Sequence, residues 1–319
     1  MTIDHDLIVL DYMTDLVTIM YGHEGVYGVA SGVKANREGI NAYIDGFLRE
    51  ENMRFRSHSL KFERYVKQEV SRPVPLISWS AFQKRLGTFT LHGEPGQFNK
   101  SEVVGILGEN GIGKTTFVKL LAGLDSLDSG AFDTKVKVAY KPQYLEVKKD
   151  QTVADFLLEV VEKYPHQVIV PLNIEPLYTK MLSQLSGGEL QRVCVAKALG
   201  TDADLLLLDE PSAYLDVEQR LIVAKVIRSV IEERGSTALV VDHDFMFLDT
   251  VADRAMVFLG EPASSGEVNG PFSLVDGINV FLEHLGITMR RDEHSKRPRI
   301  NKPGSVKDRE QRAENRWYY

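Results

Sequence analysis

Glycines, a lysine and two threonines are concentrated in residues 108–116, which read Gly-Glu-Asn-Gly-Ile-Gly-Lys-Thr-Thr after the apolar run 103–107. Glycine lets the main chain approach a phosphate closely, and successive N–H groups followed by a helix N-terminus favour anionic oxygens. Lysine adds a positive charge, and a threonine hydroxyl is a ligand that Mg²⁺ accepts beside a nucleotide phosphate. The segment therefore predicts a phosphate-binding loop with these binding residues: Gly108, Asn110, Gly111, Gly113, Lys114, Thr115 and Thr116.

Two carboxylates, Asp209 and Glu210, directly follow the apolar run 205–208. A continuous apolar run of this length is typical of a buried strand in a parallel sheet, and ligands collect beyond the carboxyl ends of such strands. We therefore expect Asp209 to lie in the magnesium shell. Glu210 should lie beside the γ-phosphate, where it polarises the attacking water.

Two further polar side chains end predicted strands. Gln143 follows the valine-rich run 136–140 and can reach both magnesium and water, while His243 follows the apolar run 238–241. The strand before His243 should lie beside the strand before Asp209, so its imidazole can contact the γ-phosphate and report whether it is present. We predict a catalytic group of Glu210, His243 and Gln143. The predicted magnesium ligands are Thr115, Gln143 and Asp209.

The segment 185–193, Leu-Ser-Gly-Gly-Glu-Leu-Gln-Arg-Val, lies between the phosphate loop and the Asp-Glu pair. This order of motifs resembles an ABC-type ATPase over residues 76–260 and implies ATP and Mg²⁺ as cofactors. In that family Ser186 and Gly188 would bind the γ-phosphate held by a different cassette, and Asp216 would couple the two sites. The resemblance also implies an aromatic ring on the adenine, for which Phe89 is preferred to Phe82, although either can be a core residue instead.

The predicted fold class is α/β, a P-loop NTPase with an ABC-type nucleotide-binding domain and a helical signature arm. Residues 76–140 should form a strand-rich nucleotide-binding half, 150–200 the arm, and 205–260 the remaining parallel strands with helices between them. Within the last part, apolar residues recur at three and four positions over 221–233, which predicts a helix facing the core.

An internal repeat relates the start of the chain to residues 242–290. At an offset of 243 − 5 = 238 residues, Asp4-His5-Asp6 matches Asp242-His243-Asp244, and twelve of the 49 positions from 4 to 52 are identical without a gap. About three identities are expected for unrelated segments at ordinary residue usage. Residues 1–52 therefore copy the tail of a cassette, and His5 would have served a site whose other motifs are absent. We expect the chain to be a portion of a longer protein, produced by truncation or by a natural split of the gene.

The chain as a whole resembles the subfamily E ABC proteins, also called the RNase L inhibitor family, and the archaeal members most of all. The phrases that carry this resemblance lie at 108–117, 140–144, 184–193, 211–216 and 297–302. It implies four parts, which are a remnant of a first cassette at 1–28, a hinge at 29–72, a second nucleotide-binding domain at 73–288, and a basic C-terminal hinge tail at 289–319.

The same resemblance implies a twin-cassette ATPase that splits ribosomes into subunits after termination. Its partners would be the ribosomal subunits, a release factor, and a second cassette supplied upstream or in trans. Family members carry two iron–sulfur clusters in an N-terminal domain, but Cys194 is the one cysteine here, so we expect no cluster in this chain. The alternatives are a membrane transporter's ATPase subunit, which the duplicated tail disfavours, and a regulatory module that does not hydrolyse ATP, which Glu210 disfavours.

Charge and hydropathy agree with these expectations. The formal net charge is −7, yet residues 290–319 hold ten Lys or Arg against five Asp or Glu, a balance of +5. Such a basic segment either meets RNA or an acidic partner or serves as a surface strap, and Pro298, Pro303 and Gly304 argue against a continuous helix there. Because no apolar run approaches the roughly 18 residues of a spanning helix and the start is acidic, we expect a cytoplasmic protein that does not enter membranes.

Overall fold

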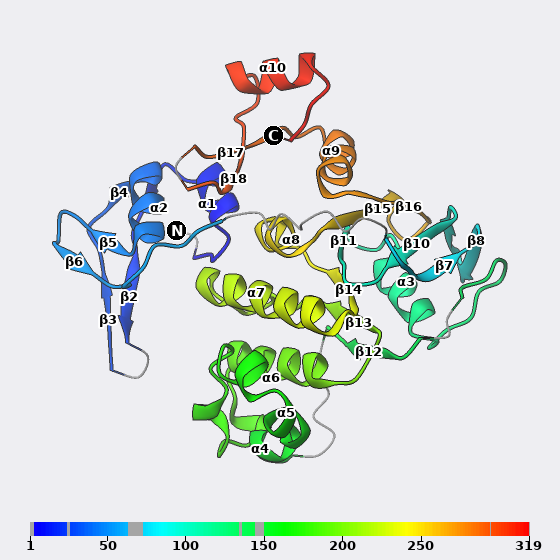
Figure 1. The fold of residues 1–319 in the computed structure, drawn as a ribbon. Coiled ribbons are helices and arrows are strands. Elements are labelled where there is room, and N and C mark those ends of the chain that lie inside the picture. The colour runs from blue at the N-terminus through cyan, green and yellow to red at the C-terminus, as the bar shows by residue number, and fades with distance from the viewer. Residues whose placement is uncertain are drawn as a thin grey trace. The chain divides into compact units, whose positions relative to one another are not determined.

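The computed structural model describes residues 3–23, 26–62, 73–133, 136–143, 150–293 and 295–318. The chain divides into two compact units, which we call the terminal unit (Met1–Glu63 and Gly286–Tyr319) and the cassette unit (Arg64–Leu285). Each is described by itself (Figure 1). Residues 63–72 of the predicted hinge and Tyr144, beside Gln143, lie outside the described residues.

The cassette unit is built on an 8-stranded sheet with the strand order β12-β13-β14-β11-β15-β16-β9-β8. Neighbours from β12 to β15 run parallel, β16 is antiparallel to β15, and β8 is antiparallel to β9. A separate two-stranded sheet pairs β7 with β10. The strands are β7 (Pro75–Trp79), β8 (Phe82–Leu86), β9 (Phe89–Gly93), β10 (Gly96–Asn99), β11 (Val103–Leu107), β12 (Val138–Lys141), β13 (Leu205–Asp209), β14 (Thr237–Val241), β15 (Arg254–Glu261) and β16 (Ser265–Ser273).

The helices of this unit fall into two groups (Figure 1). Each helix of one group follows a strand of the sheet, and this group comprises α3 (Lys114–Leu121), α7 (Val217–Arg234), α8 (Phe245–Val251) and α9 (Leu274–Leu285). The other group, drawn in green, is the predicted arm and comprises α4 (Val153–Phe156), α5 (Leu158–Lys163), the π-helix η1 (Pro165–Ile169), the 3₁₀ turns η2 (Glu175–Leu177) and η3 (Leu182–Gln184), and α6 (Gly187–Gly200). Within the described ranges, none of the helices combines the length and the apolar character that a membrane crossing requires.

The central strands are buried because their side chains are apolar on both faces. Every residue of β11, β13 and β14 is buried. Leu208 pairs with Val240 and Asp209 with Val241, which confirms that the strands before Asp209 and His243 are neighbours. The carboxyl ends of these parallel strands therefore meet at one edge of the sheet, and the motif residues follow them.

The terminal unit joins both ends of the chain. Its N-terminal part contains α1 (Leu7–Met13), β1 (Leu16–Val17), β2 (Met20–His23), β3 (Tyr27–Ala30), β4 (Lys34–Ala35), α2 (Asn36–Asp45), β5 (Phe47–Leu48) and β6 (Met53–Arg54). Its C-terminal part contains the antiparallel pair β17 (Met289–Arg291) and β18 (Pro298–Ile300), followed by α10 (Val306–Ala313). This confirms the prediction that Pro298 and Pro303 prevent one continuous helix over the C-terminal segment.

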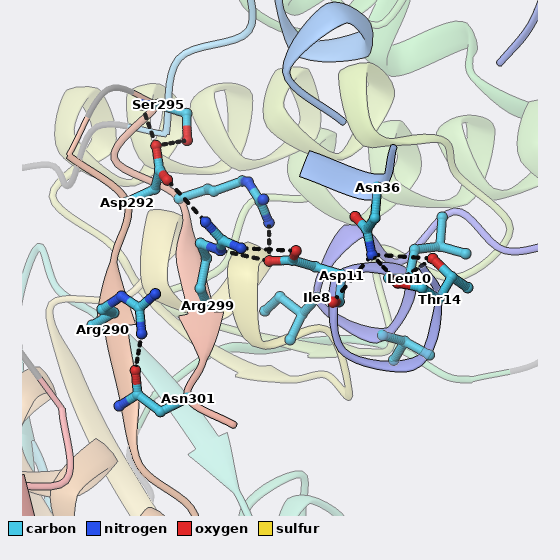
Figure 2. A network of polar contacts seen from close by, with 12 residues as sticks. Ile8, Leu10, Asp11, Thr14, Asn36, Arg290, Asp292, Ser295, Arg299 and Asn301 are labelled. Carbon is cyan, nitrogen blue, oxygen red and sulfur yellow. Dashed lines mark hydrogen bonds and ion pairs between the residues drawn. The ribbon is translucent and has the colours of Figure 1, made fainter. Parts of the chain in front are cut away.

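A buried ionic network connects these two parts (Figure 2). Arg299 on β18 donates from Nε and Nη2 to the carboxylate of Asp11 on α1, at 2.6 and 3.0 Å. Arg297 Nη1 lies 3.1 Å from the same carboxylate, and Arg299 also donates to Asp292 at 3.3 Å. On the other side of α1, the amide of Asn36 donates to the carbonyl of Leu10 at 3.0 Å.

The internal repeat has a structural counterpart. Helix α1 and helix α8 begin and end at equivalent positions, since 7 + 238 = 245 and 13 + 238 = 251. Each is capped by the aspartate after the repeated histidine, Asp6 and Asp244 respectively. The β2–β3 hairpin pairs Gly22 with Gly28, and β15–β16 pairs the equivalent Gly260 with Gly266. The same local fold therefore occurs in both units.

Candidate nucleotide-binding and hydrolysis site

The phosphate loop connects β11 to α3. Its glycines adopt backbone angles that side chains disfavour, with φ of +151° at Gly108, +79° at Gly111 and +96° at Gly113. A Cβ added at Gly108 would come within 2.7 Å of Ile112 and 2.8 Å of Phe258. Lys114, in the first turn of α3, donates from Nζ to the Gly108 carbonyl at 2.6 Å, which places its ammonium inside the curl of the loop. The loop therefore combines main-chain N–H groups, a helix N-terminus and a cation, as a bound phosphate requires.

Asp209, at the end of β13, is a buried carboxylate with an exposed fraction of 2%. Burial raises its pKa, and the charge of Glu210 raises it further. Tyr140 donates to Asp209 Oδ2 at 3.5 Å, and burial raises the pKa of this tyrosine to about 12. A divalent cation would relieve the cost of two adjacent carboxylates, so the donor set fits magnesium.

The predicted magnesium ligands Thr115, Gln143 and Asp209 contribute one carboxylate between them. Among the described residues there is no cluster of three or more His, Cys, Asp or Glu side chains that could hold a metal ion. Magnesium commonly binds through one or two carboxylates together with substrate phosphates and water. The site thus fits an ion that arrives with the nucleotide, and its role would be to neutralise phosphate charge.

The three predicted catalytic residues lie together. Gln143 donates from Nε2 to Glu210 Oε1 at 2.7 Å, and His243 Nε2 lies 3.3 Å from the same oxygen. Burial, followed by the charge of Lys114, lowers the pKa of His243, which favours the neutral imidazole. A neutral imidazole can either donate to or accept from a group beside Glu210.

Two residues of this site were not predicted from the sequence. Lys141 Nζ donates to the main-chain carbonyls of Asp209 at 2.7 Å and Glu210 at 3.2 Å. Gln191, on α6, donates from Nε2 to the Glu210 carbonyl as well. Lys141 ends β12 two positions before Gln143, and this place beside a predicted site residue was the signal that the sequence offered.

The residues predicted to act on another cassette, Ser186, Gly188 and Asp216, make their contacts apart from the Glu210 cluster. Ser186 caps α6, accepting from the Glu189 N–H while its own N–H donates to the Glu189 carboxylate. A Cβ on Gly188 would lie 3.0 Å from the Tyr214 carbonyl, so glycine permits the close approach of these two segments. Asp216 caps α7 through the Gln219 N–H at 2.8 Å. The capping bonds of Ser186 and Asp216 are therefore to their own helices rather than to the Glu210 cluster.

The two aromatic candidates differ in position. Phe89 is half-buried, and a Cβ on Gly113 would lie 3.0 Å from its ring. Phe82 is buried in the hydrophobic core and stacks on Phe117 at 5.8 Å between ring centroids. Phe89 therefore lies against the phosphate loop, whereas Phe82 is a core residue.

A largely parallel sheet with a phosphate loop and an Asp-Glu pair at its carboxyl edge, combined with a helical arm carrying Ser-Gly-Gly, defines the nucleotide-binding domain of an ABC-type ATPase. Residues 91–213 match the ABC transporter family. The chain belongs, within this class, to the ABC transporter E family.

The first of three relatives shows this family, and the other two are similar to nearly the whole chain. The chain is 41% identical over 170 residues to ABC transporter E family member 3 of Arabidopsis thaliana, covering 50% of this chain and 94% of that protein. It is 49% identical over 324 residues to an uncharacterized ABC transporter ATP-binding protein of Methanocaldococcus jannaschii, covering 99% of this chain and 54% of that protein. A solved complex of the archaeal ribosomal stalk protein aP1 with the archaeal ribosome recycling factor aABCE1 superposes with a TM-score of 0.91 at 46% identity, covering 99% of this chain and 62% of that one. The chain thus spans about half the length of the archaeal relative it matches.

Proposed function

We propose that this chain contributes the second nucleotide-binding domain and both hinge segments of a twin-cassette ATPase that acts on ribosomes. The observation that carries the proposal is the structural repeat, because α1 with the β2–β3 hairpin reproduces α8 with β15–β16 in helix bounds, cap and strand register. One cassette has all of its motifs, and a second is represented by its tail.

Apolar side chains that are exposed in the N-terminal copy of the repeat indicate which part of a first cassette this copy would contact. Ile3, Met13 and Met20 are 85%, 72% and 69% exposed, whereas their equivalents Val241, Val251 and Phe258 are 2%, 0% and 1% exposed. In the cassette unit Val241 lies in β14 and Phe258 in β15, which both pair with β11, the strand that leads into the phosphate loop. Val251 ends α8, the helix between these two strands. We infer that the corresponding core of a first cassette covers the apolar side chains of the tail.

Each predicted residue then has a role in ATP hydrolysis. The loop from Gly108 to Thr116 would bind the phosphates and Phe89 the adenine, while Thr115, Gln143 and Asp209 would hold magnesium. Glu210 would orient and polarise the attacking water, with Gln143 and His243 fixing the position of its carboxylate. Ser186 and Gly188 would complete the first cassette's site across the interface, and Asp216 would couple the two sites.

The ribosomal role rests on the relatives. The superposed archaeal protein is a ribosome recycling factor solved in complex with a ribosomal stalk protein. By this similarity the whole protein would separate ribosomal subunits in the cytoplasm after termination, with a release factor as a further partner. The basic segment 290–319 is suited to an acidic or RNA surface.

Complementation tests the trans arrangement in this chain. Lys114→Ala removes the loop cation and Ser186→Arg blocks the signature, so each variant alone should lack turnover even at high protein concentration. Mixing them permits one heterodimeric site with an intact loop on one copy and an intact signature on the other, so turnover should return. The unmodified chain should hydrolyse MgATP slowly, with a rate per molecule that rises with protein concentration.

Two results would contradict this proposal. One is fast hydrolysis by a monomer at a rate independent of concentration, and the other is equal turnover in the Ser186→Arg variant and the parent. The ribosomal part is tested with a longer chain that includes a first cassette, by sucrose-gradient sedimentation of ribosomes with and without MgATP. Unchanged subunit peaks in the presence of a release factor would count against it.

A further inference from the structure

The main chain at Glu210 adopts an unusual conformation. Its φ is +48°, in the left-handed region that residues with a side chain avoid, at a cost of about 1 kcal/mol or more. Its N–H donates to the Val241 carbonyl at 2.7 Å, which ties this peptide to the end of β14. A strained residue of this kind persists only where surrounding contacts hold it, so the contacts of its carbonyl matter for where the carboxylate points.

Lys141 supplies one of these contacts. Its side chain is buried at the end of β12, and Nζ donates to the Asp209 carbonyl at 2.7 Å and the Glu210 carbonyl at 3.2 Å. A buried ammonium with main-chain acceptors is an expensive arrangement, because burial disfavours the charge. An uncharged side chain would pack here at lower cost, so the cation indicates a function at these two carbonyls.

Gln191 supplies the second contact. It is buried on α6, the helix that begins directly after Ser186, and its Nε2 donates to the Glu210 carbonyl. The Ala213 N–H, at 3.4 Å, is a weaker third donor. The Glu210 carbonyl is therefore bound from the segment that leads to Gln143 and from the signature helix at once.

We propose that Lys141 and Gln191 are positioning residues that clamp the Glu210 peptide in its left-handed conformation and thereby aim the carboxylate at the attacking water. Through Gln191 the signature helix, which reads the other cassette's nucleotide, also acts on the hydrolytic residue of its own cassette. This inference rests on the proposed function, in which Glu210 polarises water. Both clamp side chains donate to the main chain at Asp209 and Glu210 and not to the phosphate loop, so their loss should affect turnover and leave ATP binding intact.

The test uses Lys141→Met and Gln191→Met, which keep linear side chains of similar size, in the 319-residue chain at a concentration where the parent turns over. Lys137→Met is the matched control, since Lys137 precedes β12 and its exposed Nζ pairs with exposed Asp202 at 3.0 Å. We expect each clamp variant to lower kcat roughly tenfold to a hundredfold. The Kd for MgATP, measured by calorimetry, should stay within about threefold of the parent, and the control should match the parent in both.

Because both side chains bind one carbonyl, their effects should not be additive, and the double variant should lose less than the product of the single losses. Three results would overturn the clamp, namely unchanged kcat in both single variants, a Kd that weakens in step with kcat, or a double loss equal to the product. The proposed function fails separately. If the parent shows no turnover above Glu210→Gln at any concentration, hydrolysis at this site is contradicted, whereas an active parent with fully active clamp variants contradicts only the clamp.

Discussion

At the scale of single residues, the two adjacent carboxylates of the site, Asp209 and Glu210, lie in different environments. Asp209 is buried at the end of β13 and its pKa is raised, as expected of a carboxylate that a divalent cation would stabilise in its charged form. Glu210 accepts from Gln143 and lies next to His243, so its oxygen is fixed by side chains that themselves follow strand ends. Neighbouring carboxylates in different environments can serve different roles, and those that we propose are metal binding for Asp209 and water activation for Glu210.

The first prediction for this division concerns Glu210→Gln, which keeps the shape of the side chain and removes its charge. MgATP should still bind with an affinity close to that of the parent, because the phosphate loop is untouched. Turnover should fall by about two to four decades, the usual contribution of a general base. Binding is measured by calorimetry and turnover by phosphate release in a two-cassette protein. Parental turnover in this variant would mean that another group activates the water.

At the scale of elements, motif residues and long-range contacts differ in how well the sequence predicts them. Strands β11, β13 and β14 and the residues that follow them were predictable, because apolar runs and contiguous motifs are local signals. Lys141 and Gln191 were missed because many side chains can donate to a main-chain carbonyl, so a contact with the Glu210 carbonyl leaves no recognisable motif in the sequence. The contact of Arg299 with Asp11 spans 299 − 11 = 288 residues, and no spacing rule connects an arginine after a proline with a helix near the chain start.

The network of Asp11, Arg297 and Arg299 supports a prediction about the stability of α1 (Figure 2). Asp11→Asn would remove the carboxylate that the two guanidinium groups share, although Arg299 would keep its 3.3 Å contact with Asp292, and the Arg297 side chain is 0% exposed. Removing one partner of a buried ion pair costs roughly 3–5 kcal/mol, so amide exchange across 7–13 should accelerate strongly. Lys307→Ala is the control, because its pair with Glu310 is exposed and contributes at most about 1 kcal/mol. Equal protection of α1 in Asp11→Asn and the parent would show that the network adds no stability.

At the scale of the whole molecule, one chain holds a complete set of cassette motifs and a repeat of the cassette's last part. The repeat was visible as spaced identities, and the structure shows the corresponding helices with equivalent bounds and equivalent aspartate caps. The sequence did not predict which part of the chain residues 1–28 pack with. Strands β17 and β18 belong to the same compact unit as α1, so residues from both chain ends fold together. The units therefore do not follow the linear order of the predicted domains.

Two histidines occupy equivalent positions in the repeat, and this organisation predicts that they differ in function. His243 and His5 each precede the aspartate cap of a helix, α8 and α1, in an Asp-His-Asp context. His243 lies 3.3 Å from Glu210, in a cassette with its own phosphate loop, whereas His5 is exposed in the segment that we propose to be the tail of a first cassette. His243→Ala should therefore lower ATP turnover of this chain by about a hundredfold, and His5→Ala should leave it unchanged. In a longer chain that carries the first cassette's loop, signature and Asp-Glu pair, His5→Ala should lower turnover at that first site as well. Phosphate release from both chains at saturating MgATP measures this, and equal effects of the two substitutions in the 319-residue chain would refute the assignment of residues 1–28 to a first cassette.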